Sequence, residues 1–221
     1  MKPAVIQTAD GSHTLYLKEL DEQYHSVNGA ITESDYVYIQ KGYLFHTSQS
    51  PVILEIGFGT GLNALLTALS AEKQNRKTIF YSIEKYPLDN EILNKLNYGK
   101  LLSIEAEKVF QKIHNCNWGK MEQITSCFQL CKLKLDLTKD ELNRPEGCHV
   151  VYFDAFGPDK QSEMWTPAIF GKIFDQTLSG GIFVTYSAKG VVRRQLSATG
   201  FKMERLPGPP GKNEMLRGIK V

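Results

Sequence analysis

Four acidic residues stand at the ends of stretches that the sequence predicts to be buried β-strands. Each stretch is a short apolar run, which is typical of strands that are covered on both faces. Parallel strands end at a common edge of a sheet, where open α/β folds bind their ligands. We therefore expect the four carboxylates to converge on one crevice. They are Glu55, Glu84, Asp136 and Asp154.

The first of these strands, over 52–56, runs into the turn Gly57-Phe58-Gly59-Thr60-Gly61 and then into a predicted helix over 62–73. Glycines permit positive φ and let a ligand approach bare backbone amides. A dinucleotide-binding loop has a third glycine where Leu62 and Asn63 stand in this chain. Glu55 would repel a pyrophosphate but would suit the cationic methionine end of S-adenosylmethionine. The element therefore favours a methyl donor over NAD.

The other strand ends complete the predicted donor site. A carboxylate such as Glu84 can accept hydrogen bonds from both ribose hydroxyls of a nucleotide, although a surface acid beside Lys85 is the simpler alternative. Asp136 either faces the adenine amino group or merely ends its strand. The predicted cofactor-binding residues are Glu55, Gly57, Phe58, Gly59, Gly61, Asn63, Glu84, Lys85, Asp136 and Asp154.

The segment Asp154-Ala-Phe-Gly-Pro158 places a carboxylate and an aromatic ring at the tip of a strand. Methyl transfer needs a nucleophile that is aligned behind the methyl group. If the nucleophile is an amine, a carboxylate can orient it or take its proton. We predict that Asp154 and Phe156 are catalytic and that Phe156 or Trp165 stacks on a base or covers the reacting centre. The alternative for Asp154 is a turn-forming residue.

The composition is that of an ordinary globular enzyme. With 221 residues, 42% of them hydrophobic, the chain can bury one substantial core. It contains no apolar run of the roughly 18 residues that span a membrane and no apolar stretch typical of a signal peptide. Its four cysteines lack paired zinc spacing, so we expect no metal and reduced thiols in a cytoplasmic protein. A site built from Cys127, Cys131 and His114 or His149 is the less favoured alternative.

Charge is distributed unevenly along the chain. Residues 185–221 carry eight Lys and Arg side chains against two acids, a balance of +6, whereas the other 184 residues carry −4. A basic C-terminal region on an acidic body indicates a polyanionic partner such as nucleic acid. A solvated basic face without a partner is an equally good interpretation of charge alone.

Strand and helix patterns alternate after residue 51, which predicts a doubly wound α/β sheet. Residues 1–50 are strand-like, with a hairpin around Asp10-Gly11. We expect a β-rich extension over 1–50 that packs on a core domain over 51–221, and a helix that begins with Thr166 as N-cap and Pro167 in its first turn. The other predicted strands are 78–83, about 130–135, 150–153, 181–186, 201–205 and 215–221, and the other helices start near 89 and cover 101–114.

Three segments, 154–165, 185–194 and 200–218, together with Glu22-x-Tyr-His-Ser-x-x-Gly-Ala30, give the chain a specific resemblance. It resembles the bacterial tRNA wobble-uridine methyltransferases, which convert 5-aminomethyl-2-thiouridine to 5-methylaminomethyl-2-thiouridine. These occur as half of the bifunctional enzyme MnmC or alone as MnmD. The resemblance implies a Rossmann-like class I S-adenosylmethionine-dependent fold, with a mostly parallel seven-stranded sheet and an antiparallel C-terminal strand. Because 221 residues leave no room for a flavin-dependent oxidase half, it also implies the stand-alone form.

The resemblance implies that the donor residues above bind S-adenosylmethionine and that Asp154 serves the substrate amine. It also implies an anticodon stem-loop of tRNA as partner. Residues that would line the pocket for the modified uracil or contact phosphates are Tyr24, His25, Ser26, Trp165, Arg193, Arg194, Lys212 and Arg217. Hairpin packing and surface salt bridges are the alternatives for these residues, and the oligomeric state stays open.

Two other functions fit the same fold. A small-molecule methyltransferase or an aminopropyltransferase would not need the basic C-terminal region. A noncatalytic RNA-binding module would not need acids at all four strand ends.

Overall fold

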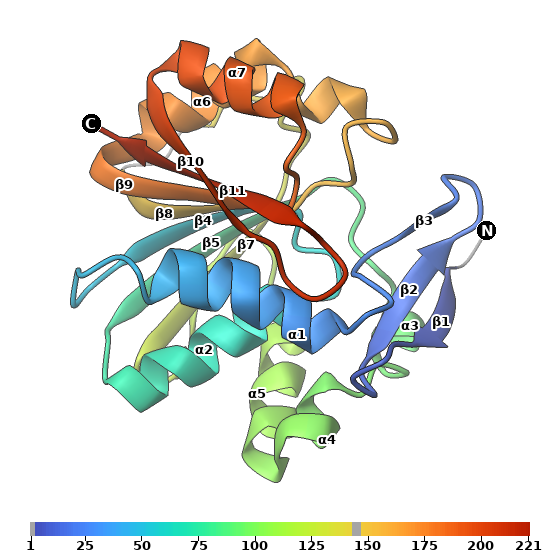
Figure 1. Cartoon of the computed structure of the whole chain (residues 1–221). Helices are drawn as coiled ribbons and strands as arrows, with labels where there is room; N and C mark the ends of the chain where they lie inside the picture. The colour runs from blue at the N-terminus through green and yellow to red at the C-terminus, as the bar shows by residue number, and fades with distance from the viewer. Residues whose placement is uncertain (1–2, 143–146) are drawn as a thin grey trace.

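A computed structural model describes residues 3–142 and 147–221 and contains an eight-stranded sheet with helices on both faces (Figure 1). The strand order is β10-β11-β9-β8-β4-β5-β7-β6. The five central strands, from β9 to β7, are parallel, and β6 and β11 run antiparallel to their neighbours. The strands are β4 (Val52–Ile56), β5 (Thr78–Glu84), β6 (Met121–Thr125), β7 (Phe128–Lys134), β8 (Cys148–Phe153), β9 (Thr177–Thr185), β10 (Phe201–Pro207) and β11 (Glu214–Lys220).

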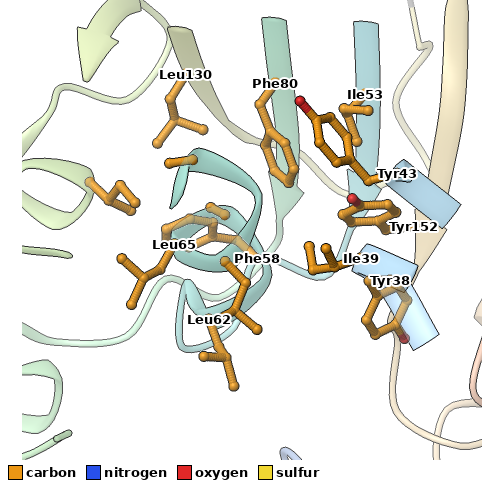
Figure 2. Packing of buried hydrophobic residues seen from close by; sticks show 14 of the residues in the cluster. Tyr38, Ile39, Tyr43, Ile53, Phe58, Leu62, Leu65, Phe80, Leu130 and Tyr152 are labelled. Atoms are coloured by element: carbon orange, nitrogen blue, oxygen red, sulfur yellow. The ribbon is translucent and has the colours of Figure 1, made fainter. Parts of the chain in front are cut away.

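Two buried clusters pack on the two faces of the sheet because the central strands alternate their side chains between them. In β4, Ile53 joins the cluster with Phe80, whereas Leu54 joins the cluster with Phe170. Figure 2 shows the first cluster. The helices are α1 (Ala30–Ser34), η1 (Asp35–Tyr43), α2 (Leu62–Gln74), α3 (Asn90–Leu93), α4 (Tyr98–Leu102), α5 (Ile104–Asn115), η2 (Ser162–Met164), α6 (Pro167–Gln176) and α7 (Gly190–Thr199).

The predicted class of fold is confirmed, with one strand more than the seven expected. The additional strand, β6, lies at the edge of the sheet and pairs antiparallel with β7. Its sequence, Met-Glu-Gln-Ile-Thr, has only one fully buried side chain, Ile124, so it lacks the apolar run that marks the central strands. The two C-terminal strands form an antiparallel hairpin, with β11 inserted between β9 and β10.

The N-terminal region is only partly the β-structure that we predicted. The hairpin is confirmed as β1 (Ala4–Gln7) and β2 (His13–Leu17), and a short β3 (Glu22–Gln23) completes a three-stranded sheet. Residues 30–43, however, are helical. The prediction was wrong because the Tyr, Val and Ile residues of this segment have strand propensity. Tertiary packing overrides that propensity.

This helical segment lies across the sheet and continues from α1 into a wider π-helix, η1. Tyr38, Ile39 and Tyr43 of η1 lie around Tyr152 of β8 (Figure 2), and the ring centroids of Tyr38 and Tyr152 are 5.2 Å apart. The contact is close, since a Cβ on Gly42 would lie 2.9 Å from a methyl of Val184. π-Helical turns often occur near functional sites. Here the π-helical turn is part of the buried core, although it belongs to the predicted N-terminal extension. The predicted domain boundary at residue 50 therefore stays a prediction.

The sequence predicted the positions of three other helices correctly and joined two helices that are separate. Thr166 is the N-cap of α6, where its side chain accepts from the Ile169 amide, and Pro167 follows at the first position. The helix predicted over 62–73 is α2, and the one predicted near residue 89 is the short α3. The helix predicted over 101–114 is interrupted at Ser103, whose hydroxyl accepts from the Ala106 amide and so starts a new helix.

Candidate active site

A cavity of about 760 Å³ opens at the carboxyl ends of the parallel strands. Its walls come from the glycine-rich loop after β4, the ends of β5, β7 and β8, the N-terminal sheet, and the loop between β10 and β11. The structure therefore brings most of the predicted site residues together. Those that line the cavity are Tyr24, His25, Ser26, Gly57, Phe58, Gly59, Asn63, Glu84, Lys85, Asp136, Asp154, Phe156 and Lys212.

The glycine-rich loop is held tightly between two strands. The amides of Gly57 and Phe58 both donate to the carbonyl oxygen of Ile83 at the end of β5, at 2.9 and 3.1 Å. Gly57 has a φ of +95°, and a Cβ there would lie 2.6 Å from the carbonyl oxygen of Asp154. Any side chain at this position would clash with β8. The loop and the tip of β8 are therefore in direct backbone contact.

Glu84 at the end of β5 presents a fixed carboxylate to the cavity. Its Oε2 accepts from the Gly59 amide at 3.1 Å, and its Oε1 accepts from the Tyr86 amide at 2.8 Å. Each carboxylate oxygen has a further lone pair that can accept another hydrogen bond. The geometry thus leaves Glu84 able to bind a pair of hydroxyl groups.

Asp136, which follows the neighbouring strand β7, is an ionised carboxylate in an ion pair. Its Oδ2 lies 3.0 Å from Nζ of Lys85, and its Oδ1 accepts from the hydroxyl and the amide of Thr138. The hydrogen bonds from Thr138 and Lys85 lower the pKa of Asp136 to about 2. Both residues line the cavity, although their mutual pairing engages part of their charge.

Asp154 is the carboxylate at the centre of the site. The hydroxyl of Tyr38 donates to its Oδ1 at 2.6 Å, and Nδ2 of Asn63 donates to its Oδ2 at 2.8 Å. Burial raises the pKa of Asp154 to about 7, and these two hydrogen bonds oppose the shift only in part. A carboxyl group with a pKa near neutrality is suited to accept a proton at physiological pH.

The raised pKa of Asp154 predicts that this residue costs stability at neutral pH. The folded protein binds a proton that the unfolded chain lacks between pH 3.8 and about 7, so the free energy of unfolding falls as the pH rises through this window. Asp154→Asn should therefore have a larger free energy of unfolding than the wild type at high pH. Its advantage over the wild type should be about 2 kcal/mol larger at pH 8 than at pH 5. Urea unfolding at both pH values measures the difference.

The control for this prediction is Asp159→Asn, which changes an exposed acid of the same loop. The free energy of unfolding of this variant should differ from that of the wild type by the same small amount at both pH values. An equal effect of Asp154→Asn at pH 5 and pH 8 would contradict the shifted pKa.

Aromatic side chains form the wall beside Asp154. The ring of Tyr24 meets that of Phe156 edge-on, with centroids 5.0 Å apart. The hydroxyl of Tyr186 donates to the Ala155 carbonyl at 2.9 Å. These rings leave flat apolar surface around one carboxylate. Such a wall can hold a planar heterocycle next to Asp154.

An ion pair crosses the same wall. Nζ of Lys212, from the loop between β10 and β11, lies 2.5 Å from Oε1 of Glu33 in α1 and 4.0 Å from the ring centroid of Tyr186. The other oxygen of Glu33 accepts from the Ser26 amide at 2.8 Å. Lys212 therefore faces the cavity, and its contact with a phosphate of the substrate stays a prediction.

His25 lies deeper, where its Nε2 is 2.9 Å from the Thr60 hydroxyl. Burial lowers the pKa of His25 to about 4, so the ring is neutral at physiological pH. It connects the N-terminal sheet to the glycine-rich loop.

Several predicted site residues do not line the cavity. Glu55, which is fully buried in β4, and Gly61, at the end of the loop, are not among the residues that line it. Trp165 is also buried and donates from Nε1 to the Phe156 carbonyl at 2.7 Å, so it supports Phe156 instead of stacking on a ligand. Arg217 is buried against the ring of Phe45 and donates to Glu204 at 2.8 Å. Its charge is thus engaged inside the protein, because β11 is not an edge strand.

Arg193 and Arg194 lie on α7, outside the cavity. Arg194 is exposed and Arg193 is partly buried. Their position leaves their predicted contact with nucleic acid untested.

Sequence reasoning gave no role to Tyr38, Glu33 and Tyr186. The signal for the helix that carries Tyr38 and Glu33 was present, since Ala30, Ser34, Val37 and Tyr38 have helical spacing and are all buried. Tyr186 is the last residue of a predicted strand, but nothing in the sequence shows which wall it would join.

Three further observations concern metal sites, membrane spans and cysteines. Within residues 3–142 and 147–221, no group of three or more His, Cys, Asp and Glu side chains is arranged to hold a metal ion. The same residues include no helix with the length and apolarity needed to cross a membrane. All four cysteines are buried thiols.

Comparison with known proteins identifies relatives of this chain. It is 31% identical over 235 residues to the tRNA 5-methylaminomethyl-2-thiouridine biosynthesis bifunctional protein MnmC of Actinobacillus pleuropneumoniae, covering 96% of this chain and 34% of the relative. The protein of the same name from Cupriavidus metallidurans is 32% identical, covering 91% of this chain and 32% of the relative. The chain thus spans about a third of the length of these relatives.

Solved structures agree with this comparison. The crystal structure of MNMC2 from Aquifex Aeolicus matches with a TM-score of 0.80 and 25% sequence identity, over 98% of this chain and 70% of that chain. A spermidine synthase structure matches with a TM-score of 0.53 and 12% identity over 100% of this chain and 74% of that chain, which shows the shared fold alone.

A family model decides the class of protein. The model described as S-adenosyl-L-methionine-dependent methyltransferase matches residues 104–221, which is more than half of the chain. That segment includes Asp136, Asp154 and Phe156 of the cavity. The chain therefore belongs to this family of S-adenosyl-L-methionine-dependent methyltransferases.

Proposed function

We propose that this enzyme transfers a methyl group from S-adenosylmethionine to the amine of 5-aminomethyl-2-thiouridine at the wobble position of tRNA, giving 5-methylaminomethyl-2-thiouridine. The observation that carries the proposal is the carboxylate of Asp154, held by Tyr38 and Asn63 between the glycine-rich loop and an aromatic wall. The names of the related proteins support the substrate. The reaction belongs in the cytoplasm, where the four cysteine thiols fit a reducing environment.

In this proposal the donor occupies the half of the cavity at the glycine-rich loop. Glu84 accepts hydrogen bonds from the ribose hydroxyls, and Asp136 with Lys85 forms the far wall at the adenine. Gly59 and Phe58 supply close backbone surface. The methionine end then lies near Asn63 and Asp154, so that the methyl group faces the aromatic wall.

The substrate amine occupies the other half. Its lone pair attacks the methyl carbon as the carbon–sulfur bond breaks, which leaves S-adenosylhomocysteine and a secondary ammonium group. Asp154 accepts a hydrogen bond from the amine N–H and takes one proton, since its pKa of about 7 allows it to be ionised at neutral pH. Alignment of amine, methyl and sulfur supplies most of the remaining rate enhancement.

Aromatic residues recognise the base in this proposal. Enzymes that read single nucleotides of RNA stack unpaired bases on aromatic side chains. Tyr24, Phe156 and Tyr186 surround the position of Asp154 and can hold a uracil whose 5-substituent points at the carboxylate. Neutral His25 and the nearby Ser26 stand beside Tyr24 as polar contacts.

The direct test uses S-adenosylmethionine with a labelled methyl group and tRNA from cells that are blocked at the aminomethyl stage. Nucleoside analysis should find the label in 5-methylaminomethyl-2-thiouridine. Fully modified tRNA serves as the control and should take up no label. Label in a polyamine or another small molecule, with none in the blocked tRNA, would support a small-molecule transferase instead.

Basic residues of α7 extend the proposal to the anticodon stem-loop. Replacing Arg193 and Arg194 by Gln should weaken tRNA binding and reduce the slope of log affinity against log salt by about 1 to 2, because each lost phosphate contact removes about one released counterion. Filter binding at several salt concentrations measures this slope.

The matched control replaces two exposed lysines of other helices, Lys73 of α2 and Lys108 of α5, by Gln. This variant has the same change in net charge and should keep the wild-type slope. If both variants behave alike, the arginines of α7 are only a solvated basic face.

A further inference from the structure

The ion pair between Lys212 and Glu33 has no part in methyl transfer itself, yet both residues line the cavity. The exposed fraction of the Lys212 side chain is 30%, whereas that of Glu33 is 8%. The ammonium group is therefore the member of the pair that a ligand in the cavity can reach. It has more N–H donors than one carboxylate oxygen uses, so it can donate to a ligand while it stays paired with Glu33.

The ammonium group is held in place from several sides. Nζ of Lys212 lies 2.5 Å from Oε1 of Glu33 and 4.0 Å from the ring centroid of Tyr186. The other oxygen of Glu33 accepts from the Ser26 amide at 2.8 Å. The loop that carries Lys212 closes on itself, since the Lys212 amide donates to the carbonyl oxygen of Pro209 at 2.9 Å. A donor that is already fixed contributes more to selectivity, because binding does not have to order it.

Tyr186 connects this donor to the tip of β8. Its ring contacts Lys212, and its hydroxyl donates to the carbonyl oxygen of Ala155, the residue after Asp154, at 2.9 Å. The charges of the ion pair also act on Asp154. Burial is the main cause that raises the pKa of this carboxyl group, and Glu33 raises it further whereas Lys212 lowers it. Lys212 therefore lies on the same side of the cavity as Asp154.

The compensated charge of Lys212 distinguishes it from a typical phosphate contact. A lysine that binds a phosphate gains affinity from the counterions that it releases. A lysine that is paired with a buried carboxylate has little net charge to offer, but its N–H groups remain directional donors. Such a group suits a neutral acceptor in the cavity, for example a carbonyl oxygen of a base.

We propose that Lys212 donates a hydrogen bond to the 4-carbonyl oxygen of the wobble uracil and so makes the enzyme select uracil over cytosine. The inference rests on the proposed function, in which the 5-aminomethyl group points at Asp154. Ring atoms 4 and 5 are neighbours, so the 4-carbonyl oxygen is the acceptor nearest to that group. Cytosine has an amino group at position 4, which would turn its own N–H donors toward Lys212. Glu33 is a positioning residue that holds the ammonium group.

The first test compares two anticodon stem-loops that differ only in the wobble base, which is either 5-aminomethyl-2-thiouracil or 5-aminomethyl-2-thiocytosine. The wild type should methylate the first with a kcat/KM at least about a hundredfold higher, because the second leaves Lys212 without an acceptor. Lys212→Met keeps the length of the side chain. It should lower kcat/KM for the uracil stem-loop at least about tenfold, with little change for the cytosine stem-loop.

The matched control is Lys202→Met, which removes an exposed lysine from β10 of the same hairpin and should keep the wild-type preference. Calorimetry with S-adenosylhomocysteine should give the same dissociation constant for both variants and the wild type, because the donor half is unchanged. If the wild type methylates the uracil stem-loop and Lys212→Met keeps the preference, this proposal alone is wrong. If the wild type methylates neither stem-loop, the proposed function fails and this proposal with it.

Binding of the uracil stem-loop at several salt concentrations separates a base contact from a phosphate contact. Lys212→Met should keep the wild-type slope of log affinity against log salt, because Glu33 already compensates the charge that is removed. A slope reduced by about 1 would mean that Lys212 contacts a phosphate and would overturn the proposal.

Glu33→Gln tests the positioning role. The amide keeps the shape of the side chain but leaves Lys212 as an uncompensated cation, so the slope against salt should become steeper by about 1. The preference for uracil should fall about tenfold at the same time, because the ammonium group is no longer held. A Glu33→Gln variant with the slope and the preference of the wild type would contradict the positioning role of Glu33.

Discussion

Asp154→Asn should lose about 99% of its turnover at neutral pH, because general-base assistance is worth about 10²–10⁴ in rate and a neutral amine already needs little of it. The variant keeps the shape of the side chain. It can still accept a hydrogen bond, but it cannot take a proton from the amine. Single-turnover methylation of the blocked tRNA, with donor and tRNA both saturating, measures the chemical step.

The same variant has a distinctive pH dependence. Wild-type turnover should rise with pH through about 7, where Asp154 ionises. The variant should lack this transition and recover in part at higher pH, since solvent then supplies more of the free amine. Asp159→Asn is the control and should follow the wild type. Near wild-type turnover at pH 7 in Asp154→Asn would exclude a catalytic role, and loss of donor binding would place Asp154 in the donor site.

Glu84→Ala should weaken the binding of S-adenosylmethionine at least about tenfold, because hydrogen bonds to a charged group contribute about 1.5–3 kcal/mol. Two losses combine in this variant. The ribose loses its acceptor, and the amides of Gly59 and Tyr86 lose theirs, so the loop itself becomes less fixed. Calorimetry with the donor or with S-adenosylhomocysteine measures the effect.

Glu91→Ala, on the surface of α3, is the control and should bind the donor as the wild type does. An unchanged dissociation constant in Glu84→Ala would remove Glu84 from the donor site. An intermediate value in Glu84→Gln would separate the contribution of charge from that of the backbone anchor.

The donor half of the site was predictable because its signals are local. A strand that ends in a glycine-rich loop sets the position of Gly57, Gly59 and the helix after them within a dozen residues. The acids at the other strand ends follow from a rule about parallel sheets, and Glu84, Asp136 and Asp154 all reach the cavity. Glu55 does not line the cavity, because successive side chains of a strand point to opposite sides and that of Glu55 is buried away from the cavity.

The acceptor half was less predictable because its contacts are distant in sequence. Tyr38 meets Asp154 across more than a hundred residues, and Lys212 meets Glu33 across more still. The residues around Tyr38 have strand propensity, and only packing against the sheet makes them helical. The environment of Arg217 was also not predictable from the sequence, since its contact with Glu204 and its burial depend on β11 lying inside the sheet.

The Lys212–Glu33 pair also has a consequence for when the enzyme becomes competent during its synthesis. The β10–β11 loop lies beside α1 (Figure 1), and Lys212 and Glu33 from these two segments form one wall of the cavity. A nascent chain can assemble the parallel strands early, but it cannot close this wall until residue 212 has left the ribosome. Contacts of such long sequence separation form late in folding. Methylation activity should therefore appear only after the β10–β11 loop has emerged and met α1.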